Sequence, residues 1–229
     1  ITIEFEDVNA DALAQLEKDG KEVYPQPKVL KLIQDKGLQK QFYKDNNFPT
    51  AEFELVENKQ EALSKITSYP VFQKLRKSGY DGYGVRKIEN ADSDIFDAPS
   101  VIEYAVKDAK EISVIVARNK KGEVTAFPTV EMEFNPEANM VEFLFSPAKI
   151  NAAIEKQATQ LAIDIITKLE MVGILAVEMF LTKDNQILVN EIAPRPHNSG
   201  HQTIEGNLTS QYAQHLRAIL NLPLGNTAI

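Results

Sequence analysis

The sequence predicts an α+β fold arranged as two lobes. Strand patterns occur in neighbouring pairs separated by short turn sequences, which is typical of antiparallel sheets. Helical patterns lie before and between these pairs, and the longest, residues 152–170, comes directly before a strand pair at residues 174–193. We expect the boundary between the two lobes near residues 90–105.

The first half of the chain begins with an alternating strand pattern at residues 1–6 and an amphipathic helix at residues 9–19, which Gly20 closes. Residues 24–27 contain two prolines that hold the chain extended and mark a break. The other elements expected here are helices at 28–36, 38–46 and 58–66 and strands at 51–57, 70–76 and 85–89.

The second half continues with an apolar run at residues 100–106 and with a hairpin that turns at Lys121-Gly122. The strands of this hairpin are expected at 111–118 and 123–131, and a further strand at 140–145. Asn151 caps the long helix, Gly173 stops it, and Thr209 caps a last helix at 211–221. The long helix carries an apolar stripe typical of a core face: Ile154, Ala158, Leu161, Ile165 and Leu169.

Composition limits the possible functions. The chain has 229 residues, 43% of them hydrophobic and 25% charged, as in ordinary globular proteins. Its net charge of −8 argues against a general nucleic-acid binder. Without cysteine there is no thiolate nucleophile and no cysteine zinc site, and no segment is apolar enough to span a membrane. The chain begins directly with a strand-like pattern and without Met, so we expect it to be part of a longer protein.

Two glutamates on the last strand pair form the first candidate site. Asp184 and Asn185 tolerate the left-handed backbone of a two-residue turn, and that turn places Glu178 opposite Glu191 on one side of the sheet. Two like charges in this position are destabilising, and Mg²⁺ held by the carboxylate oxygens would compensate for them. The alternative is a pair of solvent-exposed glutamates that repel each other only weakly.

The segment after Glu191 favours a functional site over that alternative. It reads IAPRPHNSGH and brings Arg195, His197 and Asn198 within about ten residues of the carboxylates. A second candidate is the loop KSGYDGYG at residues 77–84, whose glycines let the backbone approach a ligand and whose N–H groups can cradle phosphate. No helix follows this loop, so it is neither a P-loop nor a dinucleotide motif.

Taken together, the motifs resemble the ATP-grasp ligases. Lys74 with GYDGYG, Glu103 with YAV, Glu111, and NEIAPRPHNSGH at residues 190–201 carry this resemblance. Within that superfamily the chain is similar to the 5-(carboxyamino)imidazole ribonucleotide synthases, the ATPase subunit of phosphoribosylaminoimidazole carboxylase in purine biosynthesis. The segments that point to this family are IEFE (3–6), QDK (34–36), QK (39–40), TSQYAQHLRA (209–218) and LPLG (222–225).

The resemblance implies an ATP-grasp fold of two α+β lobes. Residues 1–26 would be the tail of a preceding α/β domain, residues 27–100 the small lobe with a glycine lid, and residues 101–229 the large lobe, with the C-terminal domain of the family missing. It also implies a cytoplasmic, homodimeric ligase that uses ATP and Mg²⁺. The reaction would carboxylate 5-aminoimidazole ribonucleotide with bicarbonate through carboxyphosphate, without nucleic-acid or membrane partners.

The resemblance implies a role for each matching residue. Glu178 and Glu191 would hold Mg²⁺, with Asn190 beside them, and Arg195, His197 and Asn198 would hold bicarbonate and the developing carboxyphosphate. Glu4, Glu6 and Tyr80 would face the ribonucleotide, and Glu111 would bind the ribose hydroxyls of ATP. Lys36 and Lys74 would also contact the nucleotide, with Lys40 close by. The lid over the phosphates would consist of Gly79, Tyr80, Asp81, Gly82, Tyr83 and Gly84. The hinge that binds adenine would consist of Glu103, Tyr104, Ala105 and Val106.

Three positions depart from what the resemblance leads us to expect, and a fourth, Ala193, supports it. Tyr83 stands where the family usually has Arg or Lys, and Lys36 replaces a common Arg, which keeps the charge but loses a bidentate donor. Phe134 occupies the position of a nucleotide-contacting His, so that contact is not expected here. Ala193 stands where many other ATP-grasp enzymes place a metal-binding Asn, which favours this family over the wider superfamily.

Two other functions remain open from the sequence. A different ATP-grasp ligase, such as a formate-using transformylase or a biotin-carboxylase relative, would share Lys74, Glu178 and Glu191 but not APRPHNSGH. A nucleotide-binding module without catalysis is the other alternative, and the departures at Tyr83 and Phe134 are compatible with it.

Overall fold

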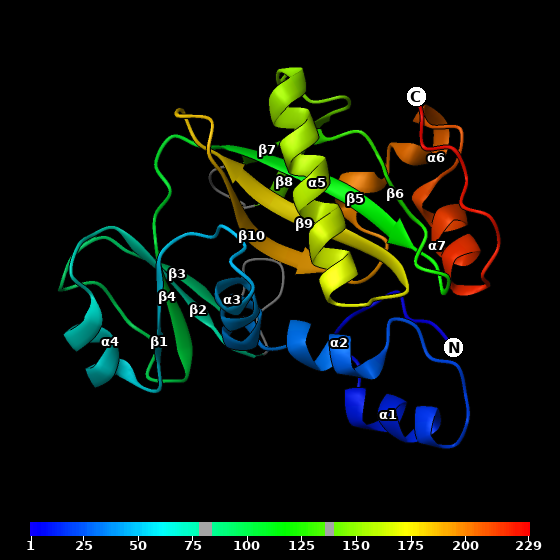
Figure 1. Cartoon of the computed structure of the whole chain (residues 1–229). Helices are drawn as coiled ribbons and strands as arrows, with labels where there is room; N and C mark the ends of the chain where they lie inside the picture. The colour runs from blue at the N-terminus through cyan, green and yellow to red at the C-terminus, as the bar shows by residue number, and fades with distance from the viewer. Residues whose placement is uncertain (78–83, 136–139) are drawn as a thin grey trace.

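The computed structural model describes residues 1–77, 84–135 and 140–229, and these residues form two antiparallel sheets with helices packed around them (Figure 1). The observed helices are α1 (Ala10–Lys18), α2 (Pro27–Ile33), α3 (Lys36–Asp45), α4 (Lys59–Lys65), α5 (Ala152–Lys168), α6 (Thr203–Gly206) and α7 (Gln211–Ile219), with a short 3₁₀ helix η1 (Asn198–Gly200). The expected α+β fold of two lobes is confirmed.

The smaller sheet has the strand order β1-β4-β2-β3. Its strands are β1 (Phe53–Val56), β2 (Val71–Leu75), β3 (Val85–Ile88) and β4 (Ser100–Tyr104). Helix α4, capped by Asn58, packs Ala62 against Val56, Val71 and Ile102 of this sheet. Because β4 pairs with both β1 and β2, the sheet of the small lobe extends to Tyr104, past the expected limit at residue 100.

The larger sheet has the strand order β10-β9-β5-β7-β8, and the short strand β6 also pairs with β5. Its strands are β5 (Lys110–Arg118), β6 (Val124–Ala126), β7 (Val130–Asn135), β8 (Met140–Phe145), β9 (Gly173–Leu181) and β10 (Ile187–Ala193). Helix α5 lies across one face (Figure 1). Its N-cap is Asn151, whose side chain accepts from two backbone N–H groups as expected.

The two faces of the larger sheet differ in character. Ile112, Val114 and Val116 of β5 point into the core beneath α5, whereas Ile115 and Ala117 form an apolar cluster on the opposite face. On that opposite face α7 packs against β5 and β9. The predicted stripe of α5 is confirmed, with Ile154, Ala158, Ile165 and Leu169 buried and Leu161 partly buried. The other end of the face opposite α5 is polar and carries the candidate site.

Helices α2 and α3, expected in the small lobe, share the core of the large sheet. Val29 and Ile33 of α2 and Tyr43 of α3 belong to the cluster beneath α5. The expected helix 28–36 ends at Ile33, because the Asp35 side chain accepts from the N–H groups of Gly37 and Leu38 and starts α3 there.

Three sequence expectations are wrong in detail. Residues 1–6 form an isolated bridge between Thr2 and Tyr24 instead of a strand, since none of the strands in the described part of the chain pairs with them. The strand expected at 123–131 is divided into β6 and β7 around Pro128, which has no N–H to donate. The side chain that caps α7 belongs to Ser210 and not to Thr209.

The chain also leaves α5 differently from the expectation at Gly173. The helix ends at Lys168, and Glu170 takes the left-handed conformation with φ of 51°. Gly173 instead opens β9 with φ of 124°, where a Cβ atom would lie 3.1 Å from Cε1 of His215. This glycine therefore allows α7 to pack closely against the sheet.

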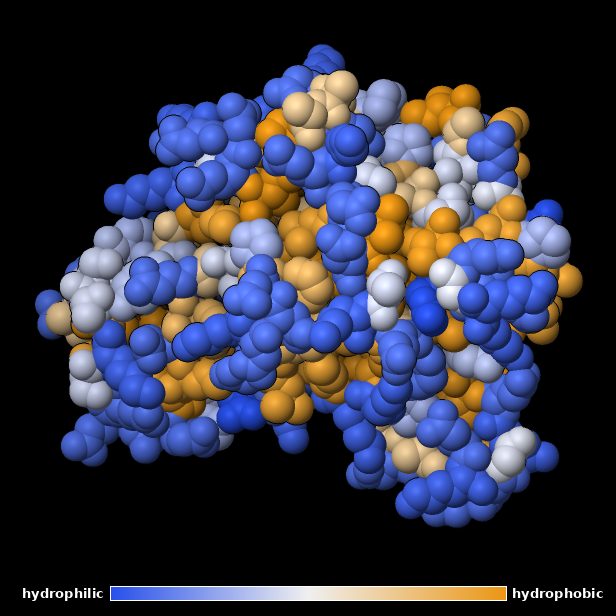
Figure 2. Space-filling view, in the orientation of Figure 1, coloured by the Kyte–Doolittle hydropathy of each residue, from blue (hydrophilic) through white to orange (hydrophobic). Residues whose placement is uncertain are grey.

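The surface is mostly polar, and hydrophobic colour gathers where α6 and α7 lie (Figure 2). The exposed apolar side chains in this part of the chain include Ile204, Leu208, Leu216 and Leu220. Among the described residues, no helix is long and apolar enough to cross a membrane.

Candidate functional site

Glu178 of β9 and Glu191 of β10 are direct cross-strand partners, as the sequence predicts. The turn that joins the strands differs from the expected two-residue turn. Thr182 N–H donates to Gln186 O at 2.9 Å, so the loop has three residues, and its last residue, Asn185, has φ of 60°. A loop of this length on its own would place Glu178 opposite Asn190 rather than opposite Glu191.

A bulge at Asn190 restores the pairing of the two glutamates. The register shifts between Val189 and Glu191, because Asn190 is an extra residue in β10. Val189 and Ile192 both point into the core beneath α5, so the two residues between them, Asn190 and Glu191, both face the site. The bulge thus presents an amide and a carboxylate side by side.

Lysines from other elements hold these two side chains. Lys36, the first residue of α3, donates to Glu191 Oε2 at 2.7 Å. Lys74 of β2 donates to Asn190 Oδ1 and to Glu103 Oε1, both at 3.0 Å. The site therefore joins the small sheet, α3 and the large sheet. The pocket at this junction is lined by Lys36, Gln39, Lys40, Lys74, Val101, Asn190 and Glu191.

Glu103 lies deeper, with 3% of its surface exposed. Its second oxygen forms an ion pair with Lys40, which also donates to Thr50 Oγ1 at 2.7 Å. Burial opposes ionisation of Glu103, but the charges of Lys74 and Lys40 outweigh it and hold the pKa of the carboxyl below its ordinary value. The carboxylate expected to accept from the adenine amine is thus directed at two lysines in this structure.

The two paired glutamates have opposite ionisation tendencies. The charge of Lys36, helped by that of Lys74, lowers the pKa of Glu191 and outweighs the opposing effect of desolvation. Burial raises the pKa of Glu178, and the nearby charge of Glu191 raises it further. The charges of Lys36 and Lys74 oppose this shift, but among the described residues no lysine or arginine forms an ion pair with Glu178.

Glu111 of β5 lies on the same face of the sheet. It is two residues from Ser113, the β5 partner of Glu178. Burial raises the pKa of Glu111 to about 7, and the charge of Glu191 acts in the same direction while Lys74 opposes it. The three carboxyl groups of Glu111, Glu178 and Glu191 thus share one electrostatic environment.

The loop after β10 returns toward Glu178. Nε2 of His197 lies 3.2 Å from Oε1 of Glu178, and 8% of His197 is exposed. Burial, helped by the charge of Arg195, lowers the pKa of His197 to about 4. Arg195 Nε donates to Glu6 Oε2 at 2.8 Å, so a residue expected at the bicarbonate site and one expected at the ribonucleotide site meet.

The remaining predicted residues are less closely connected. Asn198 is exposed at the start of η1, and Glu4 is exposed near the N-terminus. At the hinge, the hydroxyl of Tyr104 accepts from Thr67 N–H at 3.2 Å, Ala105 N–H donates to Pro70 O at 3.4 Å, and Val106 is half-buried. Gly84 has φ of 78°. Gly79, Tyr80, Asp81, Gly82 and Tyr83 lie outside the described residues.

Sequence reasoning missed several side chains that support this site. Ser113 and Ser199 are both 1% exposed and hydrogen-bonded to each other at 2.9 Å. Gln211, which is fully buried, holds the backbone of His197. Ser113 had a detectable signal, because a single hydroxyl inside the apolar run ISVIVA requires a buried partner. Ser199 and Gln211 had none apart from their place in the recognised motifs.

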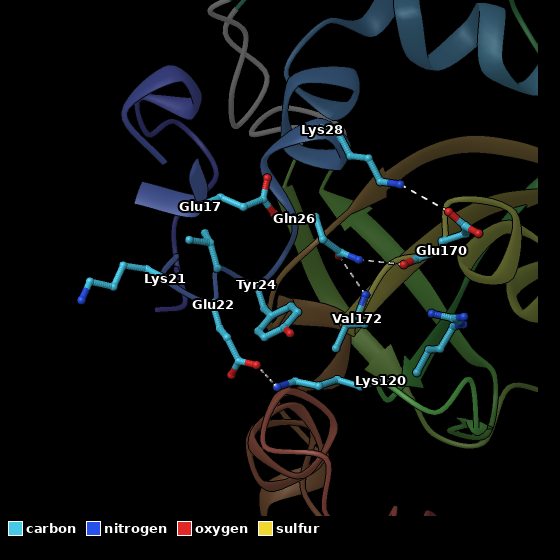
Figure 3. A pocket seen from close by; sticks show the side chains of 11 residues that line it. Glu17, Lys21, Glu22, Tyr24, Gln26, Lys28, Lys120, Glu170 and Val172 are labelled. Carbon is cyan, nitrogen blue, oxygen red and sulfur yellow. Dashed lines mark hydrogen bonds and ion pairs between the residues drawn. The ribbon is translucent and has the colours of Figure 1, made fainter. Parts of the chain in front are cut away.

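A larger surface depression lies away from these residues, between the N-terminal segment and the start of β9 (Figure 3). Its basic groups are largely paired within the protein. Lys28 contacts Glu170 at 3.3 Å and Lys120 contacts Glu22 at 2.5 Å, as the dashed lines in Figure 3 mark. It contains none of the predicted site residues, so its size does not make it the functional site.

The donors at the hairpin suit a hard cation. Among the described residues no cluster of three or more acidic, His or Cys side chains forms a complete metal cage. Mg²⁺ does not require one, because it takes one or two carboxylates and completes its octahedron with water and phosphate oxygens. Glu178 and Glu191 supply two carboxylates, and a cation between them would relieve the repulsion that burial intensifies.

Comparison with known proteins identifies the class of this fold and site. A family model described as the ATP-grasp domain matches residues 41–212, and the chain belongs to the ATP-grasp family. Within that family it is similar to N5-carboxyaminoimidazole ribonucleotide synthases, as the resemblance of its motifs predicts.

Three relatives illustrate this similarity. A phosphoribosylaminoimidazole carboxylase of Ogataea methanolica is 39% identical, over 98% of this chain and 43% of that protein. The crystal structure of the Thermotoga maritima synthetase is 42% identical with a TM-score of 0.87, over 100% of this chain and 60% of that one. An Aspergillus clavatus synthase in complex with ADP and 5-aminoimidazole ribonucleotide is 33% identical with a TM-score of 0.88, over 99% and 61%. The chain thus spans between about two fifths and three fifths of these relatives.

Proposed function

We propose that the protein containing this chain is an ATP-dependent ligase that carboxylates 5-aminoimidazole ribonucleotide with bicarbonate. The observation that supports this most directly is the hairpin of β9 and β10. It pairs Glu178 with Glu191 and continues into the loop that brings His197 back to Glu178 at 3.2 Å. One continuous segment thus supplies both the carboxylates that suit a nucleotide-bound cation and the groups that suit bicarbonate.

In this proposal ATP lies between the two sheets. Lys36 and Lys74 neutralise phosphate charge, and Asn190 helps to place the Lys74 ammonium group. Residues 103–106 form the hinge for adenine, Glu111 faces the ribose hydroxyls, and the glycine loop is the lid over the phosphates. When bound, Mg²⁺ on Glu178 and Glu191 would supply charge neutralisation at the transferring phosphoryl group.

The chemistry proceeds in two transfers. A bicarbonate oxygen attacks the terminal phosphorus of ATP, and ADP leaves to give carboxyphosphate. The amine of the ribonucleotide then takes the carbon, either directly or as released carbon dioxide, and phosphate and a proton leave. Arg195, His197 and Asn198 hold the bicarbonate-derived group, while Glu4, Glu6 and Tyr80 face the ribonucleotide. The protein contributes mainly positioning and electrostatic stabilisation.

The Arg195–Glu6 ion pair fits this arrangement. At 2.8 Å it connects the two substrate sides of the reaction, because each partner is assigned to a different substrate. The homodimer and cytoplasmic location implied by the resemblance remain predictions.

The test measures ADP release by the purified full-length protein with ATP and Mg²⁺. Release should require bicarbonate and 5-aminoimidazole ribonucleotide together and should be negligible with either alone. Release that depends on a different acid or acceptor would identify another ATP-grasp ligase. ATP binding without turnover under all of these conditions would identify a non-catalytic nucleotide-binding module.

A further inference from the structure

His197 is held by a chain of buried hydrogen bonds that starts on the opposite side of its ring from Glu178. Nδ1 of His197 lies 2.8 Å from Ser199 Oγ, and Ser199 Oγ lies 2.9 Å from Ser113 Oγ. Ser113 is the residue of β5 that pairs with Glu178 of β9. The hydrogen bonds therefore run from Ser113, whose backbone pairs with that of Glu178, through Ser199 Oγ to Nδ1 of His197. Nε2, on the other side of the ring, contacts the Glu178 carboxylate itself.

The direction of these hydrogen bonds follows from one backbone contact. The N–H of Ser199 lies 3.3 Å from Nδ1 of His197, and an N–H group can only donate. Nδ1 must therefore present its lone pair, which places the single ring proton on Nε2. The hydroxyl of Ser199 then donates to Nδ1, and its oxygen accepts from the hydroxyl of Ser113.

The backbone of His197 is held just as firmly. The Gln211 side chain accepts from His197 N–H at 2.9 Å and donates to His197 O at 2.8 Å. Gln211 is fully buried at the start of α7, and its own N–H donates to Thr203 Oγ1 at 2.9 Å. With the backbone fixed by Gln211, the ring orientation depends on what bonds Nδ1.

We propose that Ser199, supported by Ser113, is a positioning residue that holds His197 in the tautomer with its proton on Nε2 and directs that N–H at Glu178. His197 then acts as a hydrogen-bond donor at the carboxylate site. It does not act as a general base, because the only lone pair of its ring is already used by Ser199.

Ser199 itself is not a nucleophile, although Ser199, His197 and Glu178 are linked in the order of a Ser-His-acid triad. Its side chain is 1% exposed, and its hydroxyl proton is directed at Nδ1. No substrate atom can approach the oxygen without displacing Ser113 or the ring. The constellation therefore orients the imidazole and does not form a covalent intermediate.

The consequence for turnover rests on the proposed function. Loss of a group that orients a metal-site side chain typically costs on the order of 10- to 100-fold. Ser199→Ala should thus lower kcat/KM for bicarbonate about tenfold and leave the KM for ATP within about twofold. Ser113→Ala should lower kcat/KM for bicarbonate by a smaller factor, because Ser113 is one hydrogen bond further from the ring.

The experiment combines nitrogen NMR with kinetics on the full-length protein labelled with [¹⁵N]histidine. A His197→Gln variant assigns the resonances of His197. Without substrates, the wild-type ring should show a protonated Nε2 and an unprotonated Nδ1. Ser199→Ala should shift the Nδ1 resonance and speed the exchange of the Nε2 proton with water. Ser100→Ala, which removes a fully buried hydroxyl from the other sheet, is the matched control and should change neither.

The outcomes separate this inference from the proposed function. A proton on Nδ1 in the wild type would overturn the inference, as would a Ser199→Ala spectrum indistinguishable from that of Ser100→Ala. If the wild type carboxylates but Ser199→Ala leaves kcat/KM for bicarbonate unchanged, the positioning role is wrong. If the NMR pattern holds in a protein that does not carboxylate, the positioning of His197 stands and the proposed function fails.

Discussion

Glu178 and Glu191 stand opposite each other only because Asn190 is an extra residue in β10. The three-residue turn sets a register in which Ile187 pairs with Leu181, and the bulge moves the register by one residue before Glu191 is reached. The same bulge keeps Val189 and Ile192 in the core and turns two consecutive side chains toward the site. The bulge therefore presents Asn190 to Lys74 beside the ion pair of Lys36 with Glu191.

Deletion of Asn190 should preserve the carboxylate pair while removing the bulge. The shortened strand continues the register of the turn, so Glu191 still pairs with Glu178 and Ile192 still enters the core. Lys74 loses its amide partner, and ADP affinity should fall on the order of tenfold, a loss of about 1.4 kcal/mol. Calorimetric ADP binding and circular dichroism check this. Loss of the folded state on deletion would show that the bulge itself is required for the sheet.

Glu191→Gln should abolish turnover and leave the fold intact. The amide removes the charge that pairs with Lys36 but retains the size of the side chain, and no buried apolar contact changes. ADP release should drop by at least about 100-fold, as expected when a group that stabilises transition-state charge is lost. The matched control is Glu170→Gln, because Glu170 also pairs with a lysine but lies outside the site. Near wild-type turnover in the Glu191 variant would contradict the assignment.

Mg²⁺ with ADP should stabilise the folded protein only while both carboxylates are present. At about 100 times the dissociation constant, a ligand that binds only the folded state adds about 2.7 kcal/mol to the free energy of unfolding. Glu178→Gln should remove the part of the thermal shift that EDTA reverses in the wild type. The measurement is Tm with ADP alone, with ADP and Mg²⁺, and after EDTA. An equal EDTA-sensitive shift in the variant would place the cation elsewhere.

Lys74→Met should weaken nucleotide binding more than it weakens the fold. Lys74 bonds both Glu103 and Asn190, and its loss leaves Glu103 with Lys40 as its remaining ion-pair partner. The KM for ATP should rise on the order of tenfold or more, since charge-assisted bonds to phosphate are among the stronger polar contacts. Lys87→Met on the neighbouring strand β3 is the control, because Lys87 pairs only with exposed Glu89 in the described contacts. Equal effects of the two substitutions on KM would exclude a specific role for Lys74.

His215 should make the protein less stable as the pH falls below neutrality. Burial lowers the pKa of His215 to about 4, whereas an unfolded histidine has a pKa near 6.5. Between pH 7 and pH 4 the unfolded chain takes up a proton that the folded chain resists, so the free energy of unfolding falls by up to roughly 3 kcal/mol in this window. The contribution is fully present above pH 6.5.

A variant that cannot titrate tests this assignment. His215→Gln retains a donor for Thr2 Oγ1, which lies 2.7 Å from His215 Nε2. Denaturant unfolding at pH 7 and pH 5 should show a smaller loss of stability in the variant, but not its complete disappearance, because His197 has a lowered pKa as well and contributes with the same sign. His201→Gln, the same substitution at an exposed position, is the matched control.

The elements and the main motif of this protein could be predicted from local patterns. The cap at Asn151, the apolar stripe of α5 and the strand at 140–145 match the structure because each depends on residues that are neighbours in the chain. The pairing of Glu178 with Glu191 was also correct, although the turn that led to it was not. A two-residue turn and a three-residue turn followed by a bulge lead to the same partners at that point.

Only the tertiary structure decided how the site is assembled. Lys36, Lys74 and Glu191 come from three elements far apart in the sequence, and their contacts require both sheets and α3 to be in place. The bulge at Asn190 depends on the core accepting Val189 and Ile192. The direction of the His197 ring depends on the hydrogen bond between Ser199 and Ser113, which are 86 residues apart in the sequence. Local periodicity contains no information on such partners, because each hydrogen bond is formed between segments that meet only when the chain has folded.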